Sequence, residues 1–121
     1  YIFMRSAWEL NYARYLDFMV AQKQFQSWEY EPVTFWFEGI RQGCVNYKPD
    51  FKVVTASGKV EYHEVKGWMD DKSKTKLNRM RIYHPSTKIV LIGEKEYKAI
   101  SKQKAIIKGW GTWVKDNPNK K

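Results

Sequence analysis

The stretch PDFKVVTASGKVEYHEVKG, residues 49–67, decides the fold of this chain. Its β-branched and aromatic residues predict two strands, one over roughly residues 44–54 and the next over residues 60–66. Ser57-Gly58 lies between them and is typical of a tight hairpin turn. The stretch therefore predicts two antiparallel strands joined by a hairpin.

This hairpin also brings chemically active side chains together. Residues i and i+2 of a strand share a face, so Glu64 and Lys66 project together, ~6.6 Å apart along the chain, while Val65 points into the core. If the strands pair around the turn, Asp50 lies beside Glu64. Two carboxylates on adjacent strands form an oxygen site suited to Mg²⁺, and a lysine at its rim can hold a water beside a phosphate.

A third carboxylate is expected from the first helix. Residues 6–9, SAWE, form a capping box that opens a helix running to about residue 24. Ala13, Leu16 and Val20 line one stripe of this helix at helical spacing. Glu9 stands at the head of that stripe, so its side chain should point inward, where it would serve a second metal.

The remaining segments complete an α/β pattern. We expect a strand over residues 28–37 with an edge or bulge at Pro32, a helix from 70 or 71 to 83, a strand over 88–92 and a helix over 94–107. The order predicts a mixed sheet of about four strands, an antiparallel meander plus a crossover strand, flanked by helices. One domain is expected over 1–121, with its core at about 5–107 and a basic tail at 108–121.

The net charge of +9 is unevenly distributed. Residues 1–66 hold eight basic and eight acidic side chains, so the whole excess follows Lys66. A basic second half predicts a surface that binds a polyanion. We expect DNA phosphates to contact the following basic residues: Arg5, Lys48, Lys72, Lys74, Lys76, Arg79 and Arg81.

Composition narrows the class of protein. Aromatic residues make up 17% of the chain, which separates it from disordered basic tails. Cys44 is the single cysteine, so no internal disulfide forms and a reducing, cytoplasmic location is expected. No apolar run approaches the ~20 residues that a membrane span needs. Phosphate-binding loops are absent, which argues against nucleotide-driven chemistry.

Several segments together resemble the PD-(D/E)xK nuclease superfamily. The resemblance is carried by Pro49-Asp50, by Glu64-Val65-Lys66 and by the preceding helical Glu9. Four segments are similar to small phage endonucleases, including Holliday junction resolvases: RSAWE (5–9), WEYEP (28–32), YKPDF (47–51) and EVKG (64–67). The resemblance covers roughly residues 5–92 and implies a core like that of restriction endonucleases.

The resemblance implies a homodimeric, Mg²⁺-dependent endonuclease that cuts branched DNA, such as a four-way junction, in DNA recombination or repair. Mn²⁺ would substitute for Mg²⁺. Asp50 and Glu64 would bind the metal with help from the Val65 carbonyl. Glu9 would bind or support the second metal, and Lys66 would orient the nucleophilic water.

Simpler interpretations of the same residues stay open. In these interpretations, Glu9 would serve only to cap its helix. Asp50 and Glu64 would be surface carboxylates paired with Lys48 or Lys59. The basic helix would be a face exposed to solvent. The function would then be a non-catalytic nucleic-acid-binding module, and a nuclease acting on linear DNA, of restriction, flap or repair type, is a further alternative. Aromatic residues are expected in the core at positions 8, 28, 36 and 68, although Trp68 is also placed to border the cleft, and Trp110 and Trp113 have no assigned role.

Overall fold

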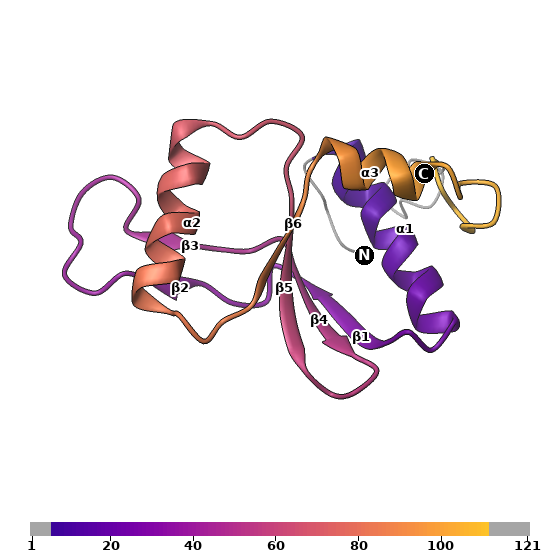
Figure 1. Ribbon diagram of the computed structural model, residues 1–121, viewed down its shortest axis with the longest axis horizontal. Helices are drawn as coiled ribbons and strands as arrows, with labels where there is room; N and C mark the ends of the chain where they lie inside the picture. The colour runs from indigo at the N-terminus through magenta and orange to yellow at the C-terminus, as the bar shows by residue number, and fades with distance from the viewer. Residues whose placement is uncertain (1–5, 112–121) are drawn as a thin grey trace, which may run out of the picture.

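The computed structural model of the chain describes residues 6–111 (Figure 1). Its elements follow in the order α1 (Ala7–Ala21), β1 (Phe25–Tyr30), β2 (Phe35–Trp36), β3 (Asn46–Tyr47), β4 (Phe51–Thr55), β5 (Val60–Val65), α2 (Asp71–Tyr83), β6 (Ile89–Ile92) and α3 (Glu94–Ser101).

The main sheet has the strand order β1-β4-β5-β6. β4 pairs antiparallel with β1 and with β5, whereas β6 runs parallel to β5. Gly58, with φ of 87°, makes the turn between β4 and β5, because glycine adopts the left-handed backbone without a steric penalty. α2 supplies the crossover that a parallel neighbour requires. The predicted α/β fold with a mixed four-stranded sheet flanked by helices is confirmed.

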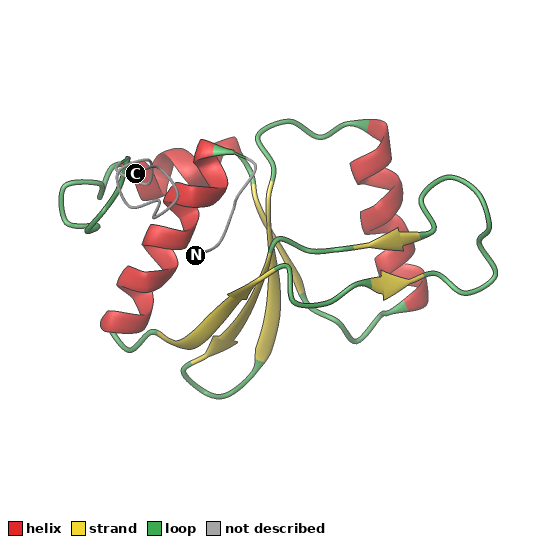
Figure 2. Cartoon of the chain, turned by 180° about the vertical axis from the view of Figure 1, so that it is seen from behind, coloured by secondary structure: helices red, strands yellow, loops and turns green. Residues whose placement is uncertain are grey.

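The two long strands expected over residues 28–37 and 44–54 are each divided in two. β1 ends at Tyr30, where Glu31 takes the left-handed φ of 45° and Pro32 has no amide proton to donate to a neighbouring strand. The second strand is interrupted at Pro49-Asp50. β2 and β3 form a separate two-stranded sheet, here called the small sheet. It lies with α2 on the opposite side of the main sheet from α1 and α3 (Figure 2).

The first core fills the space between the main sheet and the helices α1 and α3. Inward residues of α1 meet the alternate residues of β4 and β5 that face this side, as the helical stripe predicts. Its buried members are Tyr12, Ala13, Leu16, Phe51, Val53, Val65, Ile92 and Tyr97.

A smaller second core holds α2 against the small sheet. It contains Phe37, Tyr47 and Met80, with Leu77 packed against it. Asp70 caps the start of α2 by accepting a hydrogen bond from the Ser73 N–H at 2.8 Å. Pro85 follows the helix, and α2 therefore has nearly the bounds that the sequence predicts.

The first and last helices are both shorter than expected. α1 ends at Ala21 rather than near residue 24, and α3 ends at Ser101 rather than Ile107. Turns continue past α3, and Trp110 packs on Tyr97 with ring centroids 5.6 Å apart. Arg5, Trp113 and the rest of the tail from 112 lie outside the described residues.

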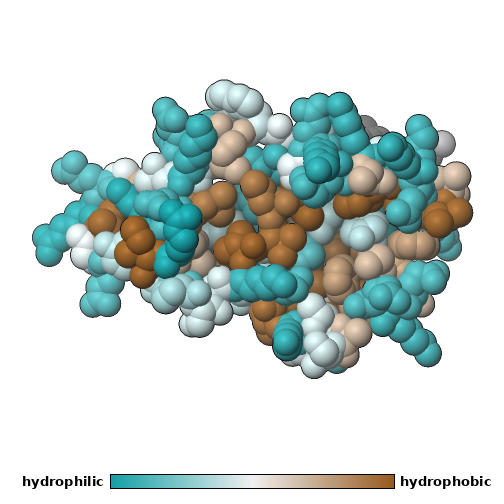
Figure 3. All heavy atoms as spheres, viewed as in Figure 1, coloured by the Kyte–Doolittle hydropathy of each residue, from teal (hydrophilic) through white to brown (hydrophobic). Residues whose placement is uncertain are grey.

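The surface carries two tryptophans that were expected in the core. Trp36 is 63% exposed and Trp68 is 75% exposed, whereas Trp8 and Trp28 pack against the first core as expected. On the face seen in Figure 3, hydrophobic residues gather in the middle, surrounded by hydrophilic side chains. Within residues 6–111, no helix combines the length and the apolar character needed to cross a membrane.

Candidate active site

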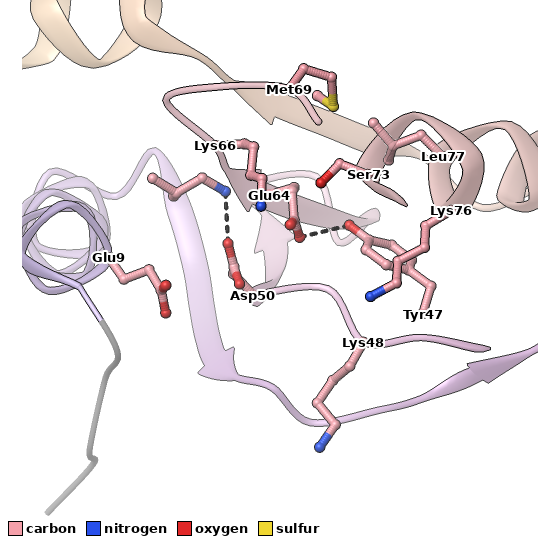
Figure 4. A pocket seen from close by; sticks show the side chains of 11 residues that line it. Glu9, Tyr47, Lys48, Asp50, Glu64, Lys66, Met69, Ser73, Lys76 and Leu77 are labelled. Atoms are coloured by element: carbon pink, nitrogen blue, oxygen red, sulfur yellow. Dashed lines mark hydrogen bonds between the residues drawn. The ribbon is translucent and has the colours of Figure 1, made fainter. Parts of the chain in front are cut away.

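A cleft of about 300 Å³ lies between one end of the main sheet and α2 (Figure 4). Its lining comes from both sides, with acidic groups from α1 and the main sheet and a mixed wall from the small sheet and α2. The lining residues are Glu9, Tyr47, Lys48, Asp50, Glu64, Val65, Lys66, Met69, Ser73, Lys76 and Leu77.

Asp50 and Glu64 meet where β4 begins and β5 ends. The register pairs Phe51 with His63, which places the preceding Asp50 beside Glu64, as the hairpin predicts. Asp50 is 2% exposed, and its Oδ2 accepts a hydrogen bond from the Val65 N–H at 2.8 Å. Since this hydrogen bond ties the side chain to the neighbouring strand, the Asp50 carboxylate is held in place beside Glu64.

Glu64 projects away from the first core, toward the small sheet. Its Oε1 accepts a hydrogen bond from the Tyr47 hydroxyl at 2.8 Å (Figure 4). Burial raises the pKa of Glu64, with the Glu9 charge acting in the same direction, while the Tyr47 hydrogen bond and the Lys66 charge oppose the rise. The pKa of Tyr47 is itself raised, first by burial and then by Glu64, so the phenol remains a donor.

Glu9 points inward from the first turn of α1, as its position on the helical stripe predicts, and is 7% exposed. The Ser6 hydroxyl caps the helix by accepting from the Glu9 N–H at 3.1 Å. The Tyr30 hydroxyl donates to Glu9 Oε1 at 2.5 Å, and Ser6 Oγ lies 3.3 Å from Oε2. Helix capping and placement in the cleft therefore coexist at this residue.

Three of the expected DNA-binding or catalytic lysines line the cleft, namely Lys48, Lys66 and Lys76. Lys72, Lys74 and Arg81 are exposed on α2 and do not line it. Arg79 donates to the Cys44 carbonyl at 2.5 Å and so joins α2 to the loop before β3, while Arg81 bonds the Asn78 side chain within the helix. The basic residues of α2 are thus divided between the cleft, the open surface and a structural contact.

The opposite face of β5 carries a separate polar group. His63 is 3% exposed, with Nδ1 2.5 Å from the Tyr12 hydroxyl and Nε2 3.0 Å from Glu61 Oε1. Lys88 lies 3.0 Å from the other oxygen of Glu61. Alternation along the strand turns His63 away from the cleft, in agreement with the sequence.

The oxygen donors of the cleft supply part of the ligand set that Mg²⁺ requires. Among residues 6–111, no three His, Cys, Asp or Glu side chains are placed to hold a metal ion together. Mg²⁺ commonly takes only one or two carboxylates and fills the rest of its octahedron with water and substrate oxygen. Asp50 and Glu64 offer such a pair of carboxylates, Val65 lines the same cleft, and Glu9 lies on the α1 side of Asp50 (Figure 4).

Several residues of the cleft were not assigned to it from the sequence. Ser73 and Leu77, together with the expected Lys76, have the i, i+3, i+4 spacing of one helix face, a pattern that could have identified the wall contributed by α2. Tyr47 and Tyr30 had no such signal, because their partners Glu64 and Glu9 are distant in sequence. Each of these tyrosines donates a hydrogen bond to one of the predicted carboxylates.

Comparison of the chain with protein-family models, with curated proteins and with solved structures finds no match. The arrangement of side chains in the cleft therefore carries the argument about function.

Proposed function

We propose that this chain is a metal-dependent DNA endonuclease of the PD-(D/E)xK type, built on a core like that of restriction endonucleases. It acts in the cytoplasm on branched DNA, in particular on four-way junctions, as a homodimer. The observation that carries the proposal is the meeting of Asp50, Glu64 and Lys66 in one cleft, at the end of a hairpin and beside Glu9.

The acidic wall would bind the cofactor. Asp50 and Glu64, with the Val65 carbonyl, would hold Mg²⁺ or Mn²⁺, and Glu9 would hold or support a second ion. Bound there, the ion supplies positive charge that screens a phosphodiester and lowers the pKa of a bound water. The placement of Asp50, which is 2% exposed, beside Glu64 in one cleft supports this assignment, because two adjacent carboxylates attract a cation.

The basic side chains would position the reactants. Lys66 directly follows the end of β5 and lines the cleft with Glu64, so its ammonium group would donate to the attacking water and orient it. In the hydrolysis, the water oxygen would bond to phosphorus as the bond to the leaving sugar oxygen breaks, with the water giving up a proton to solvent and the leaving oxygen taking one up. Lys48 and Lys76 would contact flanking phosphates, since both line the cleft. Lys72 and Lys74 would extend this contact over the exposed surface of α2.

A dimer follows from the symmetry of the proposed substrate. A four-way junction has approximate two-fold symmetry, and two identical subunits related by a two-fold axis would place one cleft at each of two opposed strands. Each copy of the chain would contribute the cleft that Asp50 and Glu64 line.

A cleavage panel tests the proposal. The full chain is incubated with a four-way junction, a matched duplex and a flap, first without Mg²⁺ and then with Mg²⁺ restored. We expect metal-dependent cutting of the junction, and an Asp50→Asn loss of about a thousandfold in rate with DNA binding retained, because a bound metal contributes several kcal/mol to the transition state.

Each other result in the panel selects an alternative. Equal cutting of duplex and junction would leave a nuclease for linear DNA and remove the junction assignment. Binding of all three DNAs with no cleavage under any metal condition would favour a nucleic-acid-binding module. Cleavage that Asp50→Asn leaves unchanged would show that the cleft is not the active site.

A further inference from the structure

Tyr47 connects the candidate active site to the second core. Its side chain is 3% exposed, and its ring packs with Phe37 and Met80. Its hydroxyl leaves this apolar surrounding at one point and donates to Glu64 Oε1 at 2.8 Å. A phenol whose ring is fixed by packing is a rigid donor, because it has few torsions left to vary.

This hydrogen bond determines how Glu64 presents its carboxylate. Glu64 has three side-chain torsions and stands at the edge of a cleft, where an unrestrained carboxylate would sample several rotamers. The hydrogen bond from the Tyr47 hydroxyl to Oε1 restricts these rotamers and with them the directions open to Oε2. Figure 4 shows the Tyr47 hydroxyl and the Glu64 carboxylate facing each other at the wall opposite Glu9.

Glu9 is held differently, which provides a matched comparison. It also accepts from a tyrosine, Tyr30, but Ser6 Oγ lies within 3.3 Å of its other oxygen. Tyr30 is only half-buried and packs against the first core. Removal of the Tyr30 hydroxyl therefore leaves Glu9 with a second side-chain contact.

We propose that Tyr47 is the positioning residue of the metal site, holding Glu64 in the orientation that binds Mg²⁺. The inference rests on the proposed function, in which Asp50 and Glu64 are the ligands. Partners that orient a metal-binding carboxylate typically change metal affinity by about 10- to 100-fold when they are removed. The small sheet and α2 would thereby set the geometry of a site whose ligands belong to the main sheet.

The test measures metal binding by the full chain without DNA. Free Mn²⁺ is counted from its electron paramagnetic resonance signal during titration of the wild type and of Tyr47→Phe, Tyr30→Phe, Phe37→Leu and Asp50→Asn. We expect Tyr47→Phe to weaken Mn²⁺ binding by about 10- to 100-fold, and Tyr30→Phe to weaken it less. In cleavage assays, Tyr47→Phe should need a correspondingly higher Mg²⁺ concentration for half-maximal rate and should recover at saturating Mg²⁺.

The controls separate positioning from stability. Phe37→Leu keeps the hydroxyl and only loosens the packing around the Tyr47 ring, so it should weaken Mn²⁺ binding less than Tyr47→Phe does; an equal loss would show that packing and not the hydroxyl sets the affinity, and would overturn the inference. Wild-type Mn²⁺ affinity in Tyr47→Phe would overturn it as well, while leaving the proposed function intact. If the wild type binds no Mn²⁺, or if Asp50→Asn binds it as well as the wild type does, the proposed metal site is overturned and the inference with it.

Discussion

The two cores of this chain differ in size and in what they contribute to the cleft. Among residues 6–111, the first core joins α1, α3 and the main sheet through eight buried residues, and Asp50, Glu64 and Glu9 lie at its edge. Over the same residues the second core has three buried members and carries the wall with Ser73, Lys76 and the Tyr47 hydroxyl. The larger core thus carries the acidic groups at its edge, and the smaller one carries the wall that faces them.

This difference implies unequal stability. A core of three buried residues removes less apolar surface from water than a core of eight, so it contributes less to folding. The small sheet also pairs over only two residues on each strand. We therefore expect the α2 side of the cleft to open at lower cost than the main sheet.

The largest effect is expected from emptying one core at a time. Phe51 is fully buried, and its ring packs against Tyr12, Trp28 and Tyr30, so Phe51→Ala should cost about 3–5 kcal/mol and lower the stability of the whole domain. Met80→Ala should cost about 2 kcal/mol, the low end for such a truncation, because fewer groups surround it.

Urea unfolding and amide hydrogen exchange measure both variants. In Met80→Ala, exchange should accelerate in α2, β2 and β3 while β4 and β5 keep their protection. Equal acceleration in all strands would contradict the comparison, since the two cores would then unfold as one unit.

An intermediate effect, on DNA binding, is expected from two lysines of α2 that lie inside and outside the cleft. Lys76 lines the cleft whereas Lys74 is exposed outside it. Lys76→Gln should weaken junction binding by up to about tenfold at low salt. The slope of log affinity against log salt concentration should become shallower by about 1, the amount expected for one lost phosphate contact. Lys74→Gln should change affinity about twofold, through the general field alone.

Fluorescence anisotropy with a labelled junction, measured over a series of salt concentrations, distinguishes the two lysines. Identical losses for Lys76→Gln and Lys74→Gln would show that the whole helix surface, rather than the wall of the cleft, contacts DNA.

Local patterns predicted the part of the site that lies on regular elements. The hairpin around Gly58 fixed the register of Asp50 and Glu64, and helical spacing placed Glu9 inward. These signals are short-range, because strand alternation, a turn glycine and a capping serine act on neighbours in sequence. The course of α2 followed from its cap and from Pro85 for the same reason.

What was missed depends on packing between distant segments. The positive φ of Glu31 ends β1 and separates the small sheet from the main one. Because glutamate has no preference for this backbone conformation, the sequence did not predict it. Tyr47 meets Glu64, and Trp36 stays exposed, through the way in which α2 and the small sheet pack. Aromatic residues were assigned to the core by type alone, which fails where the second core is too small to cover them.

The smallest expected effect concerns pH and belongs to the first core's side of β5. Burial lowers the pKa of His63, against the influence of Glu61. Burial also raises the pKa of Tyr12, so the phenol donates to Nδ1 and Nε2–H donates to Glu61. The neutral imidazole therefore has a partner at both nitrogens in the folded chain.

The sign of the pH dependence follows from this lowered pKa. In the unfolded chain a histidine titrates near 6.5, so below that pH the unfolded state binds more protons than the folded state. The contribution of neutral His63 to the free energy of unfolding should therefore be complete at pH 7.5. It should decrease as pH drops through about 6.5, by at most about 1.4 kcal/mol per pH unit. His63→Gln should be less stable at pH 7.5 and show a flatter profile between pH 7.5 and 5.5, measured by urea unfolding. His84→Asn, which changes the histidine that contacts the Trp36 carbonyl beside the second core, should keep the wild-type slope; if it removes the slope instead, the pH sensitivity belongs to the smaller core.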